Sequence, residues 1–319
     1  MRVLFVSSGN NKRMSIAPFI FAQGESVKKE GVELDYFLIK GKTVLEYVKN
    51  VPRLRAHIKA GNYDVVHAHF VLSGWVALLT FSGKPLMLSF LGTDVLGRLR
   101  APGKVSLKSR YLTLLSLLIQ PFVDAVISKS PNIQRYVYVN HKSYLIPNGV
   151  DLEKFYCSQS DFRQELDLKP NQKYLLFMGN TEDKNKNFQL VDAARQKLLA
   201  AGIEIVAPYP VPHDRVFKYL NSVNALAMTS FSEGSPNIVK EAMACNCKGV
   251  FADVGDVRYL VDSTKGYKVT SYDVDDFCRN VIDVIHAEEC EGRKRIEALK
   301  LDERSVALRI IDIYNRAIS

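Results

Sequence analysis

Short apolar runs alternate with longer segments of helical periodicity along most of the chain. Such runs, bounded by turn residues, are typical of buried strands in parallel sheets, and the periodic segments are typical of the helices between them. The first series has strands over residues 3–6, 34–39, 64–68, 86–90, 125–128 and 144–146, and helices over 16–30, 45–60 and 109–122. The second has strands over 174–178, 203–206, 225–228 and 249–251, and helices over 189–201 and 239–245. The pattern predicts an α/β fold with two parallel sheets in tandem.

The turn Pro147-Asn148-Gly149 closes the first series, and the residues that follow it lack strong periodicity. We therefore predict two domains of similar architecture, residues 1–152 and 153–302. A last helix is predicted over 303–318, with apolar residues at 306, 307, 310, 311, 313 and 314. This apolar stripe is wide enough to pack against another domain.

The composition is that of an ordinary globular protein, because 319 residues with 47% hydrophobic and 24% charged side chains suffice for two cores. The first strand starts too close to Met1 for a signal peptide, and the most apolar run, 111–123, is too polar and too short to span a membrane. The cysteines form no CxxC pairs and have no matching histidines. We expect a cytoplasmic protein with reduced thiols and no metal site.

The positive charge is concentrated in the first half of the chain. Residues 1–150 hold 20 Lys and Arg against 8 Asp and Glu, whereas residues 151–319 hold 23 against 26, so the net charges are +12 and −3. A basic half indicates an anionic membrane surface or an acidic acceptor, or simply a solvated face, while the lack of nucleic-acid motifs disfavours RNA and DNA. A basic run precedes the apolar residues 111–118, which suggests reversible binding to anionic lipid. The run consists of Arg98, Arg100, Lys104, Lys108 and Arg110.

The segment 231–250 carries the most chemistry, because Glu233 stands eight residues before Glu241 across a turn that is suited to start a helix. Pro236 favours a helix that begins near Pro236 or Asn237. The free amides and the dipole of such a helix start favour a phosphate or diphosphate. Carboxylates repel phosphate, so the two glutamates are better suited to accept hydrogen bonds from sugar and ribose hydroxyls. The alternative is structural: Glu233 caps the helix and Glu241 faces solvent.

The run Ser232-Glu233-Gly234-Ser235-Pro236-Asn237, followed by Glu241-Ala242, resembles the E-x7-E signature of the family-4 glycosyltransferases, which are retaining enzymes of the GT-B fold. Further segments resemble the family in the same order, and the resemblance covers nearly the whole chain. They are 65–69, 92–94, 147–151, Gly179 with 186–187, and 255–258.

The resemblance implies two Rossmann-like domains with a cleft between them: an N-terminal acceptor-side domain and a C-terminal domain for the nucleotide sugar. In GT-B enzymes the last helix crosses back to the first domain, so the resemblance assigns residues 303–319 to that domain. It also implies transfer of a hexosyl group from a nucleoside-diphosphate sugar with retention of configuration, without a metal or other cofactor. We expect a role in surface polysaccharide or glycolipid assembly, on a lipid-linked or saccharide acceptor, with attachment to the cytoplasmic face of the membrane.

The resemblance gives roles to individual donor-site residues. Glu233 holds the hydroxyls of the donor sugar, Glu241 holds the ribose, and Lys186 stabilises the charge of the leaving diphosphate. The other residues expected in the donor site are Gly179, Asn180, Lys184, Ser235, Pro236, Asn237, Ile238 and Val239. Asn180 replaces a common family arginine, and Lys184 is a candidate to compensate for it. No clear Asp-x-Asp metal-binding loop is evident, although Asp273, Asp275 and Asp276 are acidic enough to be considered as metal ligands.

Three residues of the first half are further candidates, because each follows a predicted strand of an open sheet. Gly9 allows close approach of the backbone to the donor but lacks the spacing of a dinucleotide fingerprint, which argues against a nicotinamide cofactor. His69 is expected to contact donor or acceptor. Asp94 either accepts a hydrogen bond from an acceptor hydroxyl or caps the segment at Val95. Leu91 stands where many family members have histidine, so that histidine's role is not carried over.

Two other classes of function stay open on the sequence. Asn180 and Leu91 replace two polar residues of the family, which is compatible with a relative that binds a sugar nucleotide or a partner enzyme without catalysis. The other alternative is a different two-domain α/β enzyme, such as a sugar-nucleotide epimerase or a phosphorylase. Release of nucleoside diphosphate from a panel of nucleotide sugars separates these classes.

Overall fold

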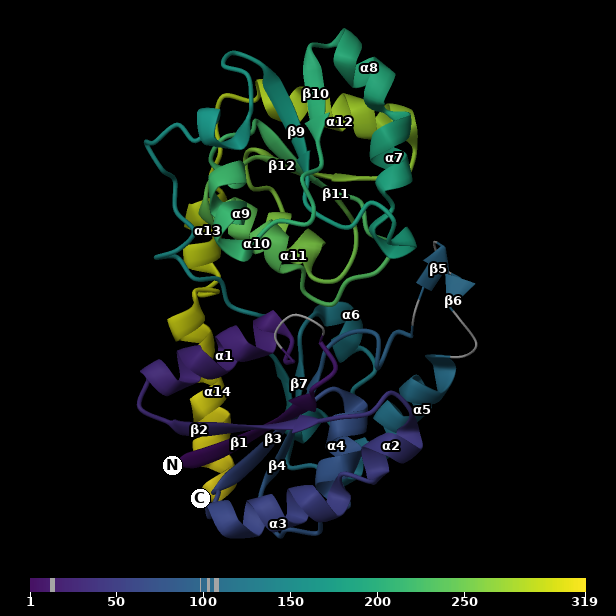
Figure 1. The fold of residues 1–319 in the computed structure, drawn as a ribbon, viewed down its shortest axis with the longest axis vertical. Helices are drawn as coiled ribbons and strands as arrows, with labels where there is room; N and C mark the ends of the chain where they lie inside the picture. Colours follow the sequence, from purple (N-terminus) through teal and green to yellow (C-terminus); the bar gives the residue numbers. More distant parts are fainter. Residues whose placement is uncertain (12–14, 98, 102–103, 106–108) are drawn as a thin grey trace. The chain divides into compact units, whose positions relative to one another are not determined.

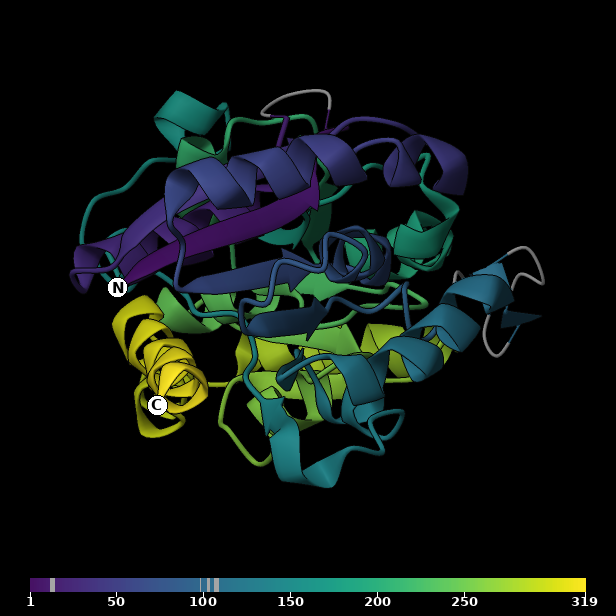
Figure 2. The ribbon, with the colours of Figure 1, turned by 90° about the horizontal axis from the view of Figure 1, so that it is seen from below.

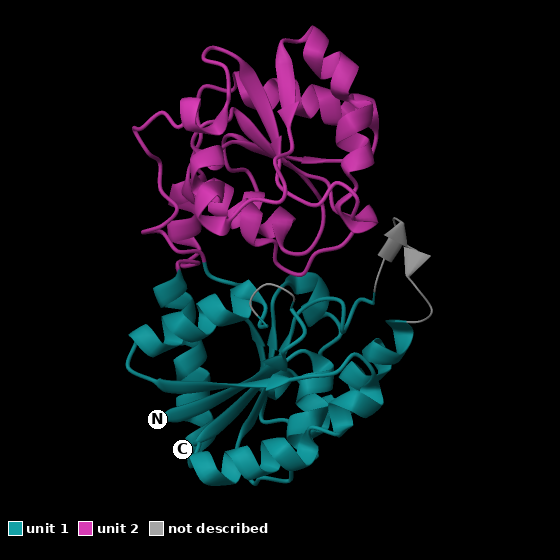
Figure 3. Cartoon of the chain, in the orientation of Figure 1, with its two compact units in different colours: residues 1–98, 105–149, 303–319 teal, residues 99–104, 150–302 magenta. Residues whose placement is uncertain are grey.

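The structure is a computed structural model that describes residues 1–11, 15–97, 99–101, 104–105 and 109–319, with side chains not described at 99–101 and 104–105. The chain divides into two compact units (Figures 1 and 3). Unit 1 comprises Met1–Arg98, Val105–Gly149 and Glu303–Ser319, and unit 2 comprises Leu99–Lys104 and Val150–Asp302. Each unit has its own parallel sheet with flanking helices, which confirms the predicted fold class of two Rossmann-like domains.

Unit 1 contains a six-stranded parallel sheet with the strand order β2-β1-β3-β4-β7-β8. The strands are β1 (Arg2–Ser8), β2 (Glu33–Ile39), β3 (Val65–His69), β4 (Leu86–Phe90), β7 (Ala125–Ser128) and β8 (Ser143–Leu145). The helices are α1 (Pro18–Lys29), α2 (Val44–Val48), α3 (Val51–Gly61), α4 (Val71–Leu78), α5 (Arg110–Ile119), α6 (Pro131–Gln134) and α14 (Glu303–Ile318). The predicted helix over 45–60 is divided into α2 and α3 at Asn50, next to the helix-starting Pro52.

Alternate residues along the strands of unit 1 face different helices, as the two-residue period of a strand requires. One face, with Leu4, Val66 and Leu88, packs into a single apolar core with residues of α3, α4 and α5. On the other face His67 contacts Tyr314 of α14, which packs against α1 (Figures 1 and 2). The segment 303–319 therefore belongs to the first unit.

Unit 2 contains a five-stranded parallel sheet with the order β10-β9-β11-β12-β13. The strands are β9 (Lys173–Phe177), β10 (Ile203–Val206), β11 (Ala225–Met228), β12 (Gly249–Ala252) and β13 (Tyr267–Thr270). The helices are α7 (Phe188–Ala193), α8 (Arg195–Ala200), α9 (His213–Leu220), α10 (Asn237–Ala244), α11 (Val257–Val261), α12 (Val274–His286) and α13 (Gly292–Ala298). A core of apolar side chains joins one face of the sheet to α7, α8 and α12, and α9, α10, α11 and α13 pack among themselves. A separate two-stranded ribbon consists of β5 (Leu99–Ala101) and β6 (Lys104–Val105).

Both sheets reverse their strand order beside the first strand of the unit, between β1 and β3 in unit 1 and between β9 and β11 in unit 2. Loops that leave the carboxyl ends of two such strands diverge, and open α/β sheets bind ligands in the crevice that results. The fold alone thus singles out the loops after β1 and β3, and those after β9 and β11. The described part of the chain contains no helix with the length and apolar character needed to cross a bilayer.

Candidate active site

The turn over residues 231–236, which carries Glu233 and which we call the glutamate turn, lies at the reversal point of the sheet of unit 2. Glu233 follows β11, Lys186 follows β9, and Gly255 follows β12, so the three residues come from neighbouring strands. The loops are tied together by two hydrogen bonds: Phe231 N donates to Asn185 O at 2.8 Å, and the side-chain Nδ2 of Asn185 donates to Ser232 O at 2.9 Å. The loop that carries Lys186 is thus held against the loop that carries Glu233.

Lys186 and Glu233 form an ion pair, with 2.7 Å between Nζ and Oε1. Lys186 lies in the short 3-10 helix η5 (Lys184–Lys186), whose Asp183 cap accepts a hydrogen bond from Asn185 N. Thr229 Oγ1 donates to Lys186 O at 3.0 Å, which fixes the backbone beneath the lysine. The two side chains are 36% and 19% exposed, so both retain access to a ligand in solution.

The helix after the turn, α10, begins at Asn237 with Pro236 as its N-cap, which confirms the predicted helix start. Pro236 has φ −69°, the value its ring imposes and a helix accepts. Val239 N donates to Pro236 O at 3.2 Å, and Val239 is fully buried. Asn237 and Ile238 are partly exposed at the positive end of the helix dipole. This end of α10 is chemically suited to an anion.

A buried chain of hydrogen-bonded polar groups lies next to the turn that carries Glu233. Lys240 Nζ donates to Ser235 Oγ at 2.5 Å, and Ser235 Oγ donates to Asp256 Oδ2 at 2.6 Å. The ammonium and the carboxylate lie 3.6 Å apart, and both side chains are 0% exposed. Burial lowers the pKa of Lys240 and raises the pKa of Asp256, while each charge favours the charged form of the other. This cluster joins the loop after β12 to the start of α10.

Gly255 brings the loop after β12 against the peptide of the glutamate turn. Its φ is +63°, in the left-handed region that glycine adopts without strain. A Cβ at this position would lie 2.5 Å from Gly234 O and 3.1 Å from Glu233 O. Both contacts are to backbone, so a side chain here must displace the Glu233–Gly234 peptide.

Replacing Gly255 with alanine is therefore expected to impair activity beyond the effect of backbone strain alone. Gly202 provides the matched control, since it has φ +75° but no atom within 4 Å of the point where an alanine Cβ would lie. Gly202→Ala should cost about 1 kcal/mol of stability and leave catalysis unchanged. Gly255→Ala should also lower kcat; equal kinetics for the two variants would show that the contact does not position Glu233.

Glu241 has a histidine partner that the sequence did not reveal. Its Oε1 lies 3.0 Å from His213 Nε2, and the glutamate side chain is 10% exposed. Lys154 Nζ lies 3.0 Å from His213 Nδ1. An ammonium only donates, so Nδ1 accepts and Nε2 carries the proton that is donated to Glu241. The contact orients one carboxylate oxygen of Glu241.

The remaining donor-site candidates form the loop after β9. A Cβ at Gly179 would meet Phe177 at 3.4 Å and Lys186 Cγ at 3.6 Å, so Gly179 lies beside the stem of Lys186. Asn180 Oδ1 accepts from Glu182 N at 3.0 Å, which makes it a turn residue of the loop. Lys184 is exposed, unlike the paired Lys186.

The candidates of unit 1 are mostly enclosed. Gly9 N donates to Ile39 O at 2.7 Å, and a Cβ there would lie 2.9 Å from Leu38 Cβ, so the close approach of this glycine is to β2. Asp94 is fully buried, and burial raises the pKa of its carboxyl to about 6. Its Oδ1 accepts from Leu91 N at 3.1 Å and Gly92 N at 2.9 Å. The Asp94 carboxylate therefore caps the turn at Leu91 and Gly92, and not the segment at Val95.

His69 and His67 lie on the same face of β3, with ring centroids 4.3 Å apart, and both are fully buried. His67 bonds Tyr314 Oη through Nδ1 at 2.5 Å and Ser89 Oγ through Nε2 at 2.8 Å. Neither ring nitrogen of His69 has a hydrogen-bond partner among the described residues. Burial lowers the pKa of both imidazoles well below the usual value, so both are neutral near pH 7. His69, which was predicted to contact donor or acceptor, is therefore enclosed in unit 1.

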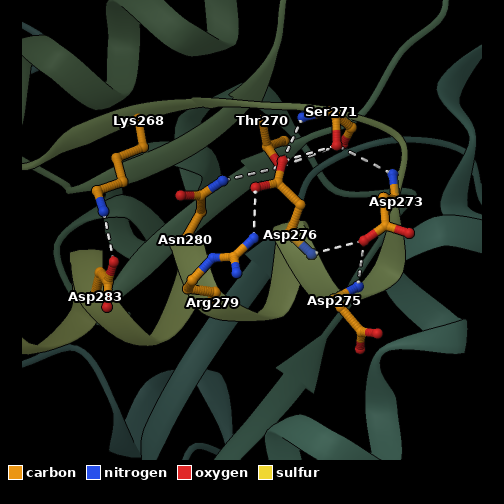
Figure 4. Close-up of polar contacts among 9 residues, drawn as sticks. All are labelled: Lys268, Thr270, Ser271, Asp273, Asp275, Asp276, Arg279, Asn280 and Asp283. Carbon is orange, nitrogen blue, oxygen red and sulfur yellow. Dashed lines mark hydrogen bonds and ion pairs between the residues drawn. The ribbon is translucent and has the colours of Figure 1, made fainter.

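The acidic segment after β13 has a structural role (Figure 4). Asp273 caps α12 by accepting from Asp275 N at 3.0 Å and Asp276 N at 2.9 Å. Asp276 accepts from Ser271 N at 2.9 Å and Ser271 Oγ at 2.7 Å, and these bonds lower its pKa to about 2. Within the described residues no group of three or more His, Cys, Asp or Glu side chains is placed to hold a metal ion.

Part of the basic run falls outside what the structure describes. Arg98 and Lys108 lie outside the described residues, as do the side chains of Arg100 and Lys104. Arg110 is described and is exposed at the start of α5.

Two residues that support the site, Lys240 and His213, were not among the predicted residues. The sequence did contain a signal for Lys240, because a lysine beside Glu241 in a mostly apolar helix suggests a buried, paired side chain. It contained no such signal for His213.

Two family models match the chain in succession. Residues 19–154 match the model described as Glycosyltransferase Family 4, and residues 162–287 match the one described as Glycosyl transferases group 1. Together they cover most of the chain, and the gap between them, residues 155–161, lies next to the predicted domain boundary.

Curated relatives are distant but span much of the chain. D-inositol 3-phosphate glycosyltransferase 2 of Catenulispora acidiphila is 25% identical over 85% of this chain and 75% of its own length. The putative teichuronic acid biosynthesis glycosyltransferase TuaC of Bacillus subtilis is 25% identical over 62% of this chain and 55% of its own length.

Solved structures resemble the fold over nearly its full length. Sucrose-phosphate synthase from Thermosynechococcus elongatus has a TM-score of 0.81 at 17% identity, covering 99% of this chain and 98% of that one. Anabaena HepE, in complex with UDP and glucose, has a TM-score of 0.74 at 14% identity, covering 99% and 100%. At such identities the likeness concerns the fold.

Proposed function

The chain belongs to glycosyltransferase family 4 and has its GT-B fold, and we propose that it moves a hexosyl group from a nucleoside-diphosphate sugar to an acceptor hydroxyl with retention of configuration. The observation that carries the proposal is the Lys186–Glu233 ion pair, 2.7 Å between Nζ and Oε1, at the strand reversal of unit 2. The ammonium of Lys186 and the carboxylate of Glu233, which can accept hydrogen bonds from hydroxyl groups, lie beside a helix start that is suited to phosphate.

The three parts of this site match the three parts of the proposed donor. The ammonium of Lys186 and the start of α10 meet the diphosphate, where negative charge grows as the glycosidic bond breaks. The carboxylate of Glu233 accepts hydrogen bonds from the hexosyl hydroxyls, and Glu241 accepts from the ribose. The ion pair holds Lys186 and Glu233 in place before the donor arrives, which lowers the cost of ordering them on binding.

The leaving phosphate itself is proposed to take the proton of the incoming hydroxyl, so the reaction needs no separate protein base. The proposal includes no metal or organic cofactor. Uridine nucleotides are the first donors to test, because HepE has been crystallised with UDP-glucose and with UDP and glucose. Cell-surface polysaccharide or glycolipid is the proposed product class, in line with the named role of the TuaC relative.

The test mixes the purified chain with a panel of nucleotide sugars, with and without saccharide and lipid-linked acceptors. Acceptor-dependent release of nucleoside diphosphate, together with a product whose anomeric proton coupling matches that of the donor, is the expected result. Inverted coupling would overturn retention. Binding without turnover would favour a non-catalytic relative, and interconversion of the donor sugar without release would favour an epimerase.

The two glutamates should separate in a binding experiment. Glu241→Ala is expected to weaken binding of free nucleoside diphosphate, because the ribose acceptor is lost. Glu233→Ala should weaken binding of the nucleotide sugar more than binding of nucleoside diphosphate, because it removes the hexosyl contact as well as the ion pair that orders Lys186. Isothermal calorimetry with both ligands measures the difference, and equal loss of nucleoside diphosphate affinity in both variants would contradict the division of roles.

A further inference from the structure

A tight turn at the start of the longer segment of unit 2 holds Lys154 in place. Asp151 Oδ1 accepts from Glu153 N at 2.9 Å and from Lys154 N at 3.0 Å. Asp151 O accepts from Phe155 N at 2.9 Å, and Phe155 is 2% exposed. We call residues 150–155 the linker turn. These hydrogen bonds fix the backbone on both sides of Lys154.

Arg293 of α13 joins the linker turn to α10. Its Nη1 donates to Phe155 O at 3.0 Å and to Ala244 O at 3.3 Å. Ala244 is the last residue of α10 and lies three positions after Glu241. A guanidinium is planar and rigid, so the two carbonyls are held at set positions relative to each other. The linker turn is therefore anchored to the helix that carries Glu241.

The side chain of His213 lies between the linker turn and Glu241. Its Nδ1 lies 3.0 Å from Lys154 Nζ, and its Nε2 lies 3.0 Å from Glu241 Oε1. The Phe155 ring packs against the imidazole in an edge arrangement, with 5.5 Å between the ring centroids. The Lys154 ammonium lies 5.6 Å from the centroid of the same phenyl ring. The imidazole is thus held at both nitrogens and by the aromatic ring beside it.

The ammonium of Lys154 sets the tautomer of His213. Because an ammonium has only donors, Nδ1 of His213 accepts from it and Nε2 carries the proton. In the opposite tautomer the lone pair of Nε2 would face the Glu241 carboxylate and repel it. With Lys154 in place, His213 donates to Oε1 of Glu241. A carboxylate has a second oxygen that can accept from a ligand hydroxyl.

The order that His213 imposes on Glu241 has a consequence for affinity. A glutamate side chain loses rotamer freedom when a ligand fixes it, and that loss weakens binding unless the side chain is already ordered. We propose that Lys154 and His213 are positioning residues for the nucleotide: Lys154 fixes the tautomer of His213, and His213 holds the Glu241 carboxylate ready for the ribose. This inference rests on the proposed function, in which Glu241 accepts from the ribose, and it extends the nucleotide site to the linker turn.

Calorimetry of the full chain tests the proposal, with UDP as the first probe and the other nucleoside diphosphates of the donor panel after it. His213→Ala should bind about tenfold more weakly, because Glu241 loses the donor that orders it. His213→Gln should stay within about threefold of the wild type, since its amide can donate from nearly the position of Nε2. Lys154→Met should lose about threefold, because the imidazole is then held at one nitrogen only. In the His213→Ala background, Lys154→Met should add no further loss, because Lys154 acts through His213.

Steady-state kinetics separates positioning from a merely structural role. The ribose lies away from the breaking bond, so its contact with Glu241 is equally strong in the ground state and the transition state. His213→Ala should therefore raise the KM for the donor by about tenfold and leave kcat nearly unchanged. A fall in kcat at unchanged KM would overturn the positioning role.

A second lysine–histidine pair in unit 2 supplies the matched control. His286 Nε2 of α12 lies 2.9 Å from Lys173 Nζ, but its Nδ1 bonds the backbone carbonyl of Ile282 at 2.8 Å and not a carboxylate. His286→Ala and Lys173→Met should therefore bind UDP as the wild type does. The side chain of His213 is 58% exposed, so His213→Ala should melt close to the wild-type temperature.

The outcomes separate this inference from the proposed function. Unchanged affinity in His213→Ala overturns the inference and leaves the proposed function standing, whereas a wild-type chain that binds no nucleoside diphosphate overturns both. Further loss from Lys154→Met in the His213→Ala background overturns the role of Lys154 through His213 and assigns Lys154 to direct contact with the ligand.

Discussion

Replacing Lys186 with alanine is expected to lower kcat/KM by about a hundredfold or more, because loss of one preorganised charge contact to the leaving group costs about 3 kcal/mol. The ion pair with Glu233, 2.7 Å between Nζ and Oε1, orders the ammonium of Lys186 before substrate binds, which reduces the reorganisation that the proposed contact with the leaving diphosphate requires. The measurement is steady-state release of nucleoside diphosphate with a donor identified in the panel.

Lys184→Ala is the matched control, since Lys184 belongs to the same short helix but is exposed. It should retain most of the activity. Lys186→Arg should recover part of the loss, because it restores the charge with a different geometry. Wild-type kinetics for Lys186→Ala, with an unchanged melting temperature, would remove Lys186 from the proposed diphosphate site.

Replacing Asp256 with alanine should destabilise unit 2 by about 3–5 kcal/mol, because it leaves the buried ammonium of Lys240 without its carboxylate. Lys240 and Asp256 are 0% exposed, so water cannot replace the lost partner. Chemical denaturation of the full chain, followed by a probe in unit 2, measures the loss.

The double variant Lys240→Met/Asp256→Ala should recover much of that stability, because it removes the charge together with its partner. The exposed pair Lys265–Glu289 supplies the contrast: Glu289→Ala should leave the melting temperature nearly unchanged. If Asp256→Ala were as stable as wild type, the ion pair would not support the glutamate turn. Activity lost in the double variant despite recovered stability would assign the cluster to positioning of Ser235.

The strands were predictable wherever burial on both faces made them continuously apolar, as in β4 and β11. The edge strand β13 was missed because Lys268 interrupts its apolar run. The helix α12 was missed although Asp273 and the acids after it are a helix-start signal, because these acids were considered only as metal ligands. The start of α10 was predicted correctly, since Pro236 acts locally.

The sequence pattern selects the residues of the proposed site but not their contacts. The family pattern selected Lys186 and Glu233, yet their 2.7 Å contact joins residues that lie 47 positions apart, in the loops that follow two neighbouring strands. The buried partnership of Lys240 with Asp256 likewise depends on strand order, which sequence spacing does not encode. For Asp94 the sequence predicted either a hydrogen bond from an acceptor hydroxyl or a cap on the segment at Val95. The turn at Gly92, with φ +132°, instead brings two amides back to its carboxylate.

The last helix has a consequence for the order in which the chain is made. Val306, Ala307, Ile310, Ile313 and Tyr314 of α14 are buried within unit 1, and the Tyr314 hydroxyl reaches His67. A ribosome delivers these residues only after all of unit 2, so the unit encoded first is the last to acquire its complete core. Until α14 is synthesised, the face of the unit 1 sheet that bears His67 lacks this helix. Unit 2 by then has all of its own strands and helices.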